Sequence, residues 1–338
     1  MSLASKLSSL SLKTRITIIV QLLFLCSIWL LTFFISSGLE HEMTAQIEAQ
    51  QSSTASYIAD SIENQVKLRL SSLTAAASFI TPERMSNAGR LRKYLHDNPL
   101  LLTMFQPGVL VISREGRVIA DYPVVPGRAG GSLSDREYFM DVVATGKPAV
   151  GKPLIGRFLR RPLIGFAVPI MDRSGRLIGL LEGSTLLSDP TLLGTIQSSP
   201  YKHFADWLLL GSRKYHMYIT GSDPTRILEP RPPPGVNPLL DRFEAGYEGS
   251  GITVNNRGIR MLVSAKQIPT PGWFIRVGQP AAMAFAPIRS MKHWAYSIAL
   301  GLSIVSSLLV WLVIRHSLRP LYTASRLIRD ITEERCRS

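Results

Sequence analysis

The stretch ITIIVQLLFLCSIWLLTFFIS spans residues 16–36, and the stretch WAYSIALGLSIVSSLLVWLVI spans residues 294–314. Each contains 21 residues and no charged side chain. At about 1.5 Å per residue, a helix of this length crosses a hydrocarbon core about 30 Å thick. Trp294, Tyr296 and Trp311 lie near the ends of the second stretch, and aromatic rings favour membrane interfaces. The sequence therefore predicts two transmembrane helices and excludes a soluble cytosolic protein.

Two other interpretations of these stretches are weaker. A buried core helix rarely stays uncharged over such a length between basic clusters. A cleaved signal peptide has an apolar core of about 7–15 residues and a site of small residues after it. The first stretch is longer than that and has no clear cleavage site behind it. We therefore interpret it as a membrane anchor.

The distribution of charge predicts the topology. The chain has 38 Lys and Arg residues, 24 Asp and Glu residues and a net charge of +14. Residues 1–15 are basic without any acid, and residues 315–338 contain six Arg residues against three acids. The remaining excess is spread over a long stretch, so nucleic acid is not an expected partner. Because segments rich in Lys and Arg next to a transmembrane helix remain on the cytoplasmic side, we expect both termini in the cytoplasm and residues 37–293 in the periplasm. The chain would then be a multi-pass protein of a bacterial inner membrane.

The external region must fold without a disulfide, because the two cysteines are Cys26, within the first stretch, and Cys336. It begins with a predicted long helix over residues 37–80, since residues 39–81 contain no Pro or Gly. Apolar side chains recur there, mainly at steps of four: Met43, Ile47, Ile58, Ile62, Val66, Leu70 and Leu73.

Short apolar runs separated by Gly and Pro follow this helix, and their order repeats after about 110 residues. Each copy is predicted to hold a β-hairpin, a loop, a helical stretch and two more strands. The strands expected in the first copy are residues 108–113, 117–122, 163–171 and 177–184, and those in the second copy are residues 215–220, 226–228, 258–265 and 273–277. Residues 229–238 are expected to form a loop and residues 249–251 a turn. The pattern indicates two α/β modules in series.

Three segments resemble the double Cache sensors. Residues 134–147 (SDREYFMDVVATGK) and 161–183 (RPLIGFAVPIMDRSGRLIGLLEG) are similar to their membrane-distal module. Residues 260–288 (RMLVSAKQIPTPGWFIRVGQPAAMAFAPI) are similar to the end of their membrane-proximal module. The resemblance covers residues 38–290 and implies an α+β membrane protein. Two PAS-like modules, at about residues 100–190 and 200–285, would then stand on the long helix between the two transmembrane helices.

The segment after the second stretch resembles the opening of a HAMP signal-transmission helix. It contains Arg319, Pro320 and Leu321, with a helix expected to restart at the proline, and apolar residues continue at heptad-like steps to Ile331. Receptors of this kind usually continue into a diguanylate cyclase, phosphodiesterase, histidine kinase or chemotaxis module, and the overall pattern most resembles the diguanylate cyclases. We expect residues 315–338 to be a truncated HAMP-like helix and the output module to be absent from this chain.

The resemblance also implies a ligand site in the distal module. One family signature reads Arg-x-Trp-Tyr with a later Asp, and the matching positions hold Arg136, Tyr138, Phe139 and Ser184. A guanidinium can clamp a carboxylate beside an aromatic wall. Because Ser184 replaces the acid, a ligand amino group would lack its anionic partner, which favours an organic acid or another small molecule. Alternatively, Arg136 pairs with a neighbouring acid (Asp135, Glu137 or Asp141), and the two aromatic residues fill the core.

A second basic cluster, Arg157, Arg160 and Arg161, lies between two candidate strands. It could add positive potential at the mouth of a site, with Arg157 as a further ligand residue. The alternative is a hairpin whose arginines are simply solvated.

Catalytic signals are absent. Pro148 follows Gly146 and Lys147 where a phosphate-binding loop needs Ser or Thr, so this segment is expected to be a turn after a helix. The six histidines are scattered, without metal-ligand spacing. We expect neither an enzyme nor a cofactor or metal.

The leading hypothesis is therefore an inner-membrane receptor, a homodimer, whose double Cache region senses a small molecule. One alternative is a structural or assembly protein with two spans, such as a polysaccharide chain-length regulator, whose external domain would be mainly helical. Another is a truncated regulatory subunit of a diguanylate cyclase.

Overall fold

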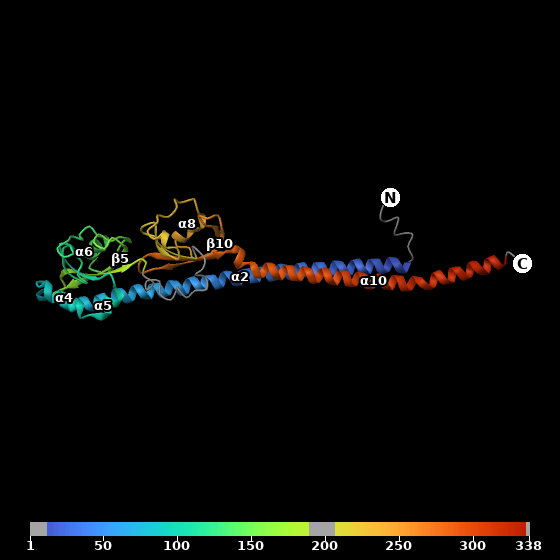
Figure 1. Ribbon diagram of the computed structural model, residues 1–338, viewed down its shortest axis with the longest axis horizontal. Helices are drawn as coiled ribbons and strands as arrows, with labels where there is room; N and C mark the ends of the chain where they lie inside the picture. The colour runs from blue at the N-terminus through green and yellow to red at the C-terminus, as the bar shows by residue number, and fades with distance from the viewer. Residues whose placement is uncertain (1–11, 189–206, 336–338) are drawn as a thin grey trace. The chain divides into compact units, whose positions relative to one another are not determined.

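The computed structural model describes residues 12–188 and 207–335, and Figure 1 shows their helices and strands coloured from the N-terminus to the C-terminus. The expectations for the N-terminal flank before residue 12 and for Cys336 lie outside these ranges. The chain divides into two compact units, one made of Met1–Gln46 with Phe285–Ser338 and the other of Ile47–Ala284.

Two long helices pass through the first unit. Helix α2 (Leu12–Ala77) has 66 residues, so the predicted anchor and the predicted long helix are one element. Helix α10 (Ala286–Arg335) has 50 residues and continues through Pro320, so the expected restart there is wrong. Both helices are long and apolar enough to cross a membrane, by length and composition.

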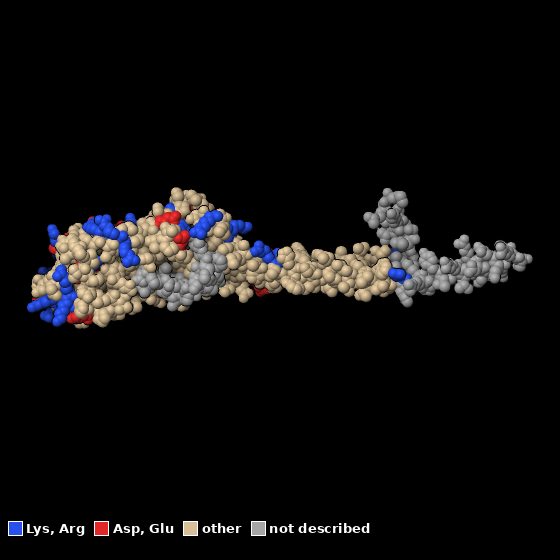
Figure 2. All heavy atoms as spheres, viewed as in Figure 1, with Lys and Arg blue, Asp and Glu red and all other residues tan. Residues whose placement is uncertain are grey.

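Within the first unit the two helices are joined by polar and aromatic contacts. Gln21 donates a hydrogen bond to Ser306 at 3.0 Å, and the rings of Trp29 and Tyr296 stack with centroids 6.2 Å apart. The surface around these contacts carries few charged side chains, as Figure 2 shows, and many of its exposed side chains are large and apolar. Exposed apolar surface of this extent requires a bilayer or a partner to cover it.

The first module of the second unit (residues 82–188) opens with three short helices, α3 (Pro82–Met85), α4 (Ala88–His96) and α5 (Pro99–Met104). Its strands are β1 (Val109–Ser113), β2 (Val118–Tyr122), β3 (Ala149–Val150), β4 (Leu154–Ile155), β5 (Pro162–Met171) and β6 (Leu177–Leu186), and helix α6 (Glu137–Thr145) precedes β3. The strands form one sheet in the order β2-β1-β6-β5-β3, with β4 also paired to β5. All pairs are antiparallel, and the predicted strands of this copy are confirmed.

The second module (residues 207–280) contains β7 (Leu208–Ser212), β8 (Met217–Gly221), η2 (Pro224–Arg226), α8 (Pro238–Glu244), β9 (Gly249–Val254), β10 (Arg260–Ile268) and β11 (Trp273–Pro280), and helix α9 (Ala281–Ala284) follows it. The sheet order is β8-β7-β11-β10-β9. With a sheet in each module, residues 37–293 are not the mainly helical domain expected of a chain-length regulator.

Two expectations for the second module are wrong. Residues 226–228 were predicted as a strand, but Pro224–Arg226 is a 3₁₀ turn capped by Asp223, and the hairpin partner of β8 is β7. A continuous apolar run, Leu208–Leu210, hides the alternation that marks a half-buried strand. Residues 249–251, predicted as a turn, begin the edge strand β9 and pair with β10.

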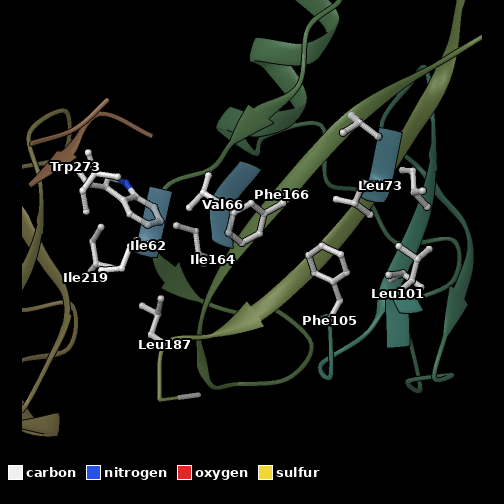
Figure 3. Packing of buried hydrophobic residues seen from close by; sticks show 14 of the residues in the cluster. Ile62, Val66, Leu73, Leu101, Phe105, Ile164, Phe166, Leu187, Ile219 and Trp273 are labelled. Carbon is white, nitrogen blue, oxygen red and sulfur yellow. The ribbon is translucent and has the colours of Figure 1, made fainter. Parts of the chain in front are cut away.

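Strand alternation divides each sheet into a face packed on α2 and a face packed on its own short helix. In β1, Val109 and Val111 belong to the core formed with α2, whereas Leu110 and Ile112 face α6. Figure 3 shows Ile62 and Val66 of α2 beside Ile164 and Phe166 of β5, together with Trp273 and Ile219 of the second sheet. One apolar core thus joins α2 to both modules.

Candidate ligand-binding site

A cleft of about 490 Å³, counted out to its solvent opening, lies on the α6 side of the first sheet. Its walls come from β1, β5, β6, the start of α6 and the loop around β4. Most lining residues are apolar or glycine, and the polar ones are Arg128, Arg136, Tyr138, Lys152, Arg157, Glu182 and Ser184. The cleft therefore joins a cationic rim to a single carboxyl group.

The start of α6 places Arg136 and Tyr138 at this cleft. Arg136 is the N-cap residue, with extended backbone, and α6 ends after two turns at Gly146, whose φ of 64° is left-handed. This position of Gly146 confirms the turn predicted after a helix. The guanidinium of Arg136 has no hydrogen bond or ion pair to the rest of the described chain, and it is half-buried. Among the described arginines that line the cleft, it is the one that faces no acid of the protein.

Tyr138 forms a wall of the cleft because two glycines, Gly151 just after β3 and Gly165 within β5, leave room for its ring. A Cβ atom at Gly151 would lie 2.7 Å from the ring, and one at Gly165 would lie 2.9 Å from it. The Gly151 amide also donates to the Gly165 carbonyl at 2.9 Å, which holds the two glycines together. Burial raises the pKa of Tyr138 well above its usual value, so its hydroxyl stays protonated.

Glu182 is the carboxyl group of the cleft. It lies in the central strand β6 and is 1% exposed. Ser184 Oγ donates a hydrogen bond to its Oε1 at 2.7 Å, whereas its Oε2 is buried without a hydrogen-bond partner. Burial raises the pKa of Glu182 to about 7, against the opposing effects of Ser184, Arg128 and Arg136.

Arg128 is the buried cation of the cleft and faces Asp121. Its Nε lies 3.9 Å from Asp121 Oδ2, and its Nη2 donates to the Pro107 carbonyl at 3.4 Å. Burial lowers the pKa of Arg128, and the charges of Asp121 and Glu182 oppose this shift. Arg128 is thus already engaged within the protein.

Arg157 stands at the solvent-exposed part of the cleft. Its guanidinium donates to the Asp135 carboxylate and to the Ser132 carbonyl, both at 2.6 Å. Arg160 and Arg161 are exposed and do not line the cleft. The arginine cluster is therefore divided, with one member at the site and two in solvent.

Four of the residues singled out from the sequence come together at the cleft: Arg136, Tyr138, Arg157 and Ser184. Phe139 does not line it but packs in the apolar cluster on the α6 face, to which Tyr138 also belongs. The acids that could have paired with Arg136 have other partners, since Asp135 binds Arg157 and both Glu137 and Asp141 face Lys214.

Sequence reasoning missed Arg128, Lys152 and Glu182. For Glu182 a signal was present, because β6 reads LIGLLEGSTL and a lone acid in an apolar strand is costly to bury unless it is hydrogen-bonded, paired or protonated. Arg128 and Lys152 lie in loops, where no periodicity predicts which side chains turn inward. Among the described residues, no group of three or more His, Cys, Asp or Glu side chains could hold a metal ion.

Comparison with solved structures places this fold among ligand-binding domains of bacterial chemoreceptors. The domain of Pseudomonas aeruginosa PAO1 PctB in complex with L-Arg gives a TM-score of 0.58 at 14% identity, covering 76% of this chain and 98% of that one. The domain of Pseudomonas fluorescens CtaA in complex with L-isoleucine gives a TM-score of 0.57 at 14% identity, covering 73% of this chain and 98% of that one. The domain of Mlp24 with asparagine gives a TM-score of 0.54 at 15% identity, covering 74% of this chain and 98% of that one. At such identities the likeness establishes the fold alone.

A search of curated proteins found no match to the chain. The sequence itself matches the family model dCache_1, described as Cache domain, over residues 39–288. That match covers most of the chain and includes both modules and the cleft. The chain belongs to the double Cache domain family.

Proposed function

We propose that this protein is a membrane receptor that binds a small carboxylate in the cleft of its first module. The observation that carries the proposal is the unengaged guanidinium of Arg136 in a cleft whose other arginines, Arg128 and Arg157, already face acids of the protein. A carboxylate can accept two parallel hydrogen bonds from such a group. The amino acids bound by PctB, CtaA and Mlp24 support a ligand of this size.

The two apolar helices would carry the signal across a bacterial inner membrane, with both termini in the cytoplasm. Helix α2 contributes Ile62 and Val66 to the core that it shares with the first sheet, and its own N-terminal part is the first candidate span. A ligand that favours one arrangement of that sheet would therefore act on the helix directly. The ligand can shift the equilibrium between two arrangements of the sheet only by the difference in its affinity for them.

A homodimer would cover the exposed side of α2. Tyr57 is 67% exposed and Leu68 is 48% exposed, and their spacing of eleven residues puts them on one stripe of the helix. Sedimentation of the full chain in detergent tests this, and a monomeric mass would contradict it.

The binding proposal is tested with Arg136→Ala in the full chain, reconstituted in lipid nanodiscs. We expect titration calorimetry to find a ligand among the twenty standard amino acids, 4-aminobutanoate and a set of organic acids. Loss of a charge-assisted hydrogen bond of about 1.5–3 kcal/mol should weaken that ligand at least about tenfold in the variant.

The matched control is Arg173→Ala, which removes an exposed arginine from the β5–β6 turn of the same module. It should bind as the unmodified protein does. Equal binding by Arg136→Ala and the unmodified protein would show that the ligand does not use this guanidinium and would overturn the site.

A further inference from the structure

The turn between β7 and β8 of the second module (residues 213–216) reaches across to the first module. Its two outer residues fix it within its own module. Arg213 Nε donates a hydrogen bond to the Glu244 carbonyl at 2.8 Å, and His216 Nδ1 lies 3.6 Å from the Glu244 carboxylate. The two middle residues contact the first module instead. The turn therefore presents one pair of side chains to each module.

Lys214, the first of the middle residues, faces two acids of α6. Its Nζ lies 3.4 Å from Asp141 Oδ2 and 3.8 Å from Glu137 Oε2. The two acids lie on the same side of the helix, because they are four residues apart. Helix α6 follows its cap residue Arg136, the arginine that the proposed function assigns to the ligand carboxylate. Lys214 thus holds the helix that positions this guanidinium.

Tyr215, the second middle residue, brings together an ammonium group from each module. The centroid of its ring lies 5.2 Å from Lys214 Nζ and 5.8 Å from Lys152 Nζ. The face of an aromatic ring attracts a cation at such distances. Lys152 belongs to the segment between β3 and β4 and lines the cleft. A side chain of the second module therefore contacts a wall of the cleft in the first.

The hydroxyl end of Tyr215 lies beside the carboxylate of Glu137. Burial and this neighbouring charge raise the pKa of Tyr215 to about 12, so the hydroxyl keeps its proton. The hydroxyl and Glu137 Oε2 are both enclosed, and no described residue gives either of them a hydrogen bond of good geometry. A buried donor and a buried acceptor left unbonded cost free energy. A small movement of α6 against the turn would join them.

The corresponding turn of the first module shows that a hairpin of this sheet does not need such contacts. By sheet order, β1 and β2 correspond to β7 and β8. Arg114, Glu115 and Arg117 of the β1–β2 turn are exposed, and the Glu115 carboxylate accepts a hydrogen bond from Ser113 of its own hairpin. The contact with the other module is therefore a feature of the β7–β8 turn and not of the fold.

We propose that Lys214 and Tyr215 are positioning residues for the cleft of the first module. They hold two of its walls, α6 and the segment between β3 and β4, in the arrangement that binds a ligand, and they pass a movement of these walls to the second module. Neither is among the described residues that line the cleft, so both act through their contacts with other residues. The inference rests on the proposed function, because the ligand is taken to bind Arg136.

The experiment uses the full chain in lipid nanodiscs with both residues changed, as Lys214→Met and Tyr215→Ala in one variant. Hydrogen–deuterium exchange is measured first without any ligand. Calorimetry then measures affinity for the panel of the twenty standard amino acids, 4-aminobutanoate and organic acids, and exchange is repeated with the panel member that binds. The matched control is Arg213→Ala, which removes a neighbouring side chain of the same turn that bonds within the second module.

We expect the amides of α6 and of residues 149–155 to exchange about three- to tenfold faster in the double variant, although both substitutions lie in the other module. Affinity for the panel member should fall at least about threefold. In the unmodified protein that panel member should slow exchange in residues 213–216, and the double variant should lose this slowing. Lys214→Arg combined with Tyr215→Phe keeps the charge and the ring and should restore all three properties. Arg213→Ala should leave the exchange of α6 and the affinity unchanged.

The possible failures separate the two proposals. Equal exchange of α6 in the double variant and the unmodified protein would overturn the inference, whichever panel member binds. Faster exchange with unchanged affinity would overturn it as well, because the contacts would then only stabilise the helix, and the proposed function would stand. If no panel member binds the unmodified protein, the proposed function fails, and the positioning role fails with it.

Discussion

The two modules share the order of five sheet strands, but the side of the sheet that faces the module's own helix is filled differently in each. The strand orders β2-β1-β6-β5-β3 and β8-β7-β11-β10-β9 correspond one to one. In the first module that side holds a cleft with a free guanidinium. In the second, the side chain of Arg231 is 2% exposed, pairs with Glu244 and lies over the ring of Phe274 with its Cζ 5.4 Å from the centroid.

The ladder shows where the difference begins. Glu182 of β6 pairs with the second residue of β1, and Arg276 of β11 pairs with the second residue of β7. Equivalent positions in the two central strands thus carry opposite charges. Two residues earlier on each strand, Leu180 corresponds to Phe274, a larger side chain that fills the space under α8.

This comparison teaches that the backbone of the module does not decide whether it binds a ligand. A charge that meets its partner inside the protein becomes part of the core, as Arg231 does. A charge whose partner is missing, as with Arg136 and Glu182, leaves a site that a ligand can complete. The predictions below test this contrast through the stability of the full chain.

The largest effect is expected for Arg231→Ala in the second module. Removing one member of a buried ion pair leaves the other without compensation, which typically costs about 3–5 kcal/mol. Because Glu244 keeps 18% exposure, we expect the lower end, about 3 kcal/mol, or a fall in Tm of about 6–12 °C. Tryptophan fluorescence reports this unfolding, since Trp207 and Trp273 are buried in the second module.

Arg136→Ala is the counterpart in the first module and should change Tm far less, because its guanidinium has no protein partner to lose. Equal losses of stability in the two variants would show that Arg136 is structural, and the contrast between the modules would fail.

An intermediate effect is expected for Glu182→Gln, and it should depend on pH. The pKa of Glu182 is about 7 in the folded chain against 4.5 for an ordinary Glu, so folding favours the protonated form. The stability of the unmodified protein therefore falls as pH rises from about 4.5 to 7 and is level above that. The variant lacks this loss and should gain about 2 kcal/mol over the unmodified protein between pH 5 and pH 8.

Thermal unfolding of both proteins at a series of pH values measures this difference. Parallel curves would mean that Glu182 ionises as freely in the folded chain as in the unfolded one, and the burial that defines the buried end of the cleft would be refuted.

The sequence predicted the parts of this fold that follow from periodicity, and it failed where a tertiary contact decides. The long helix and the strands β5 and β6 follow from spacing and alternation. Strand β7 was missed because LLL shows no alternation, and β9 because glycines at its start indicate a turn.

The residues of the candidate site also fall into two groups, those that the sequence predicted and those that only tertiary contacts reveal. Arg136, Tyr138 and Ser184 follow from local motifs of the family. Glu182 gains its role only when β6 is placed between β1 and β5, which encloses its carboxyl group. Arg128 gains its role only when its loop folds back over Asp121. Glu182 is brought to the cleft by the pairing of strands that are distant in sequence and Arg128 by the path of its own loop, and no spacing along the chain reveals either.

The smallest effect is expected for Arg157→Ala. This arginine also makes an ion pair, with Asp135 at 2.6 Å, but the two side chains are 42% and 55% exposed. Water and salt screen such a pair, so its loss should cost under about 1 kcal/mol and should shrink further at high salt. Because Arg157 is already bound to the protein, ligand affinity should fall less than in Arg136→Ala. Titration of both variants with the same ligand tests which variant loses more affinity. A larger loss for Arg157→Ala would show that the ligand carboxylate binds Arg157 and not Arg136.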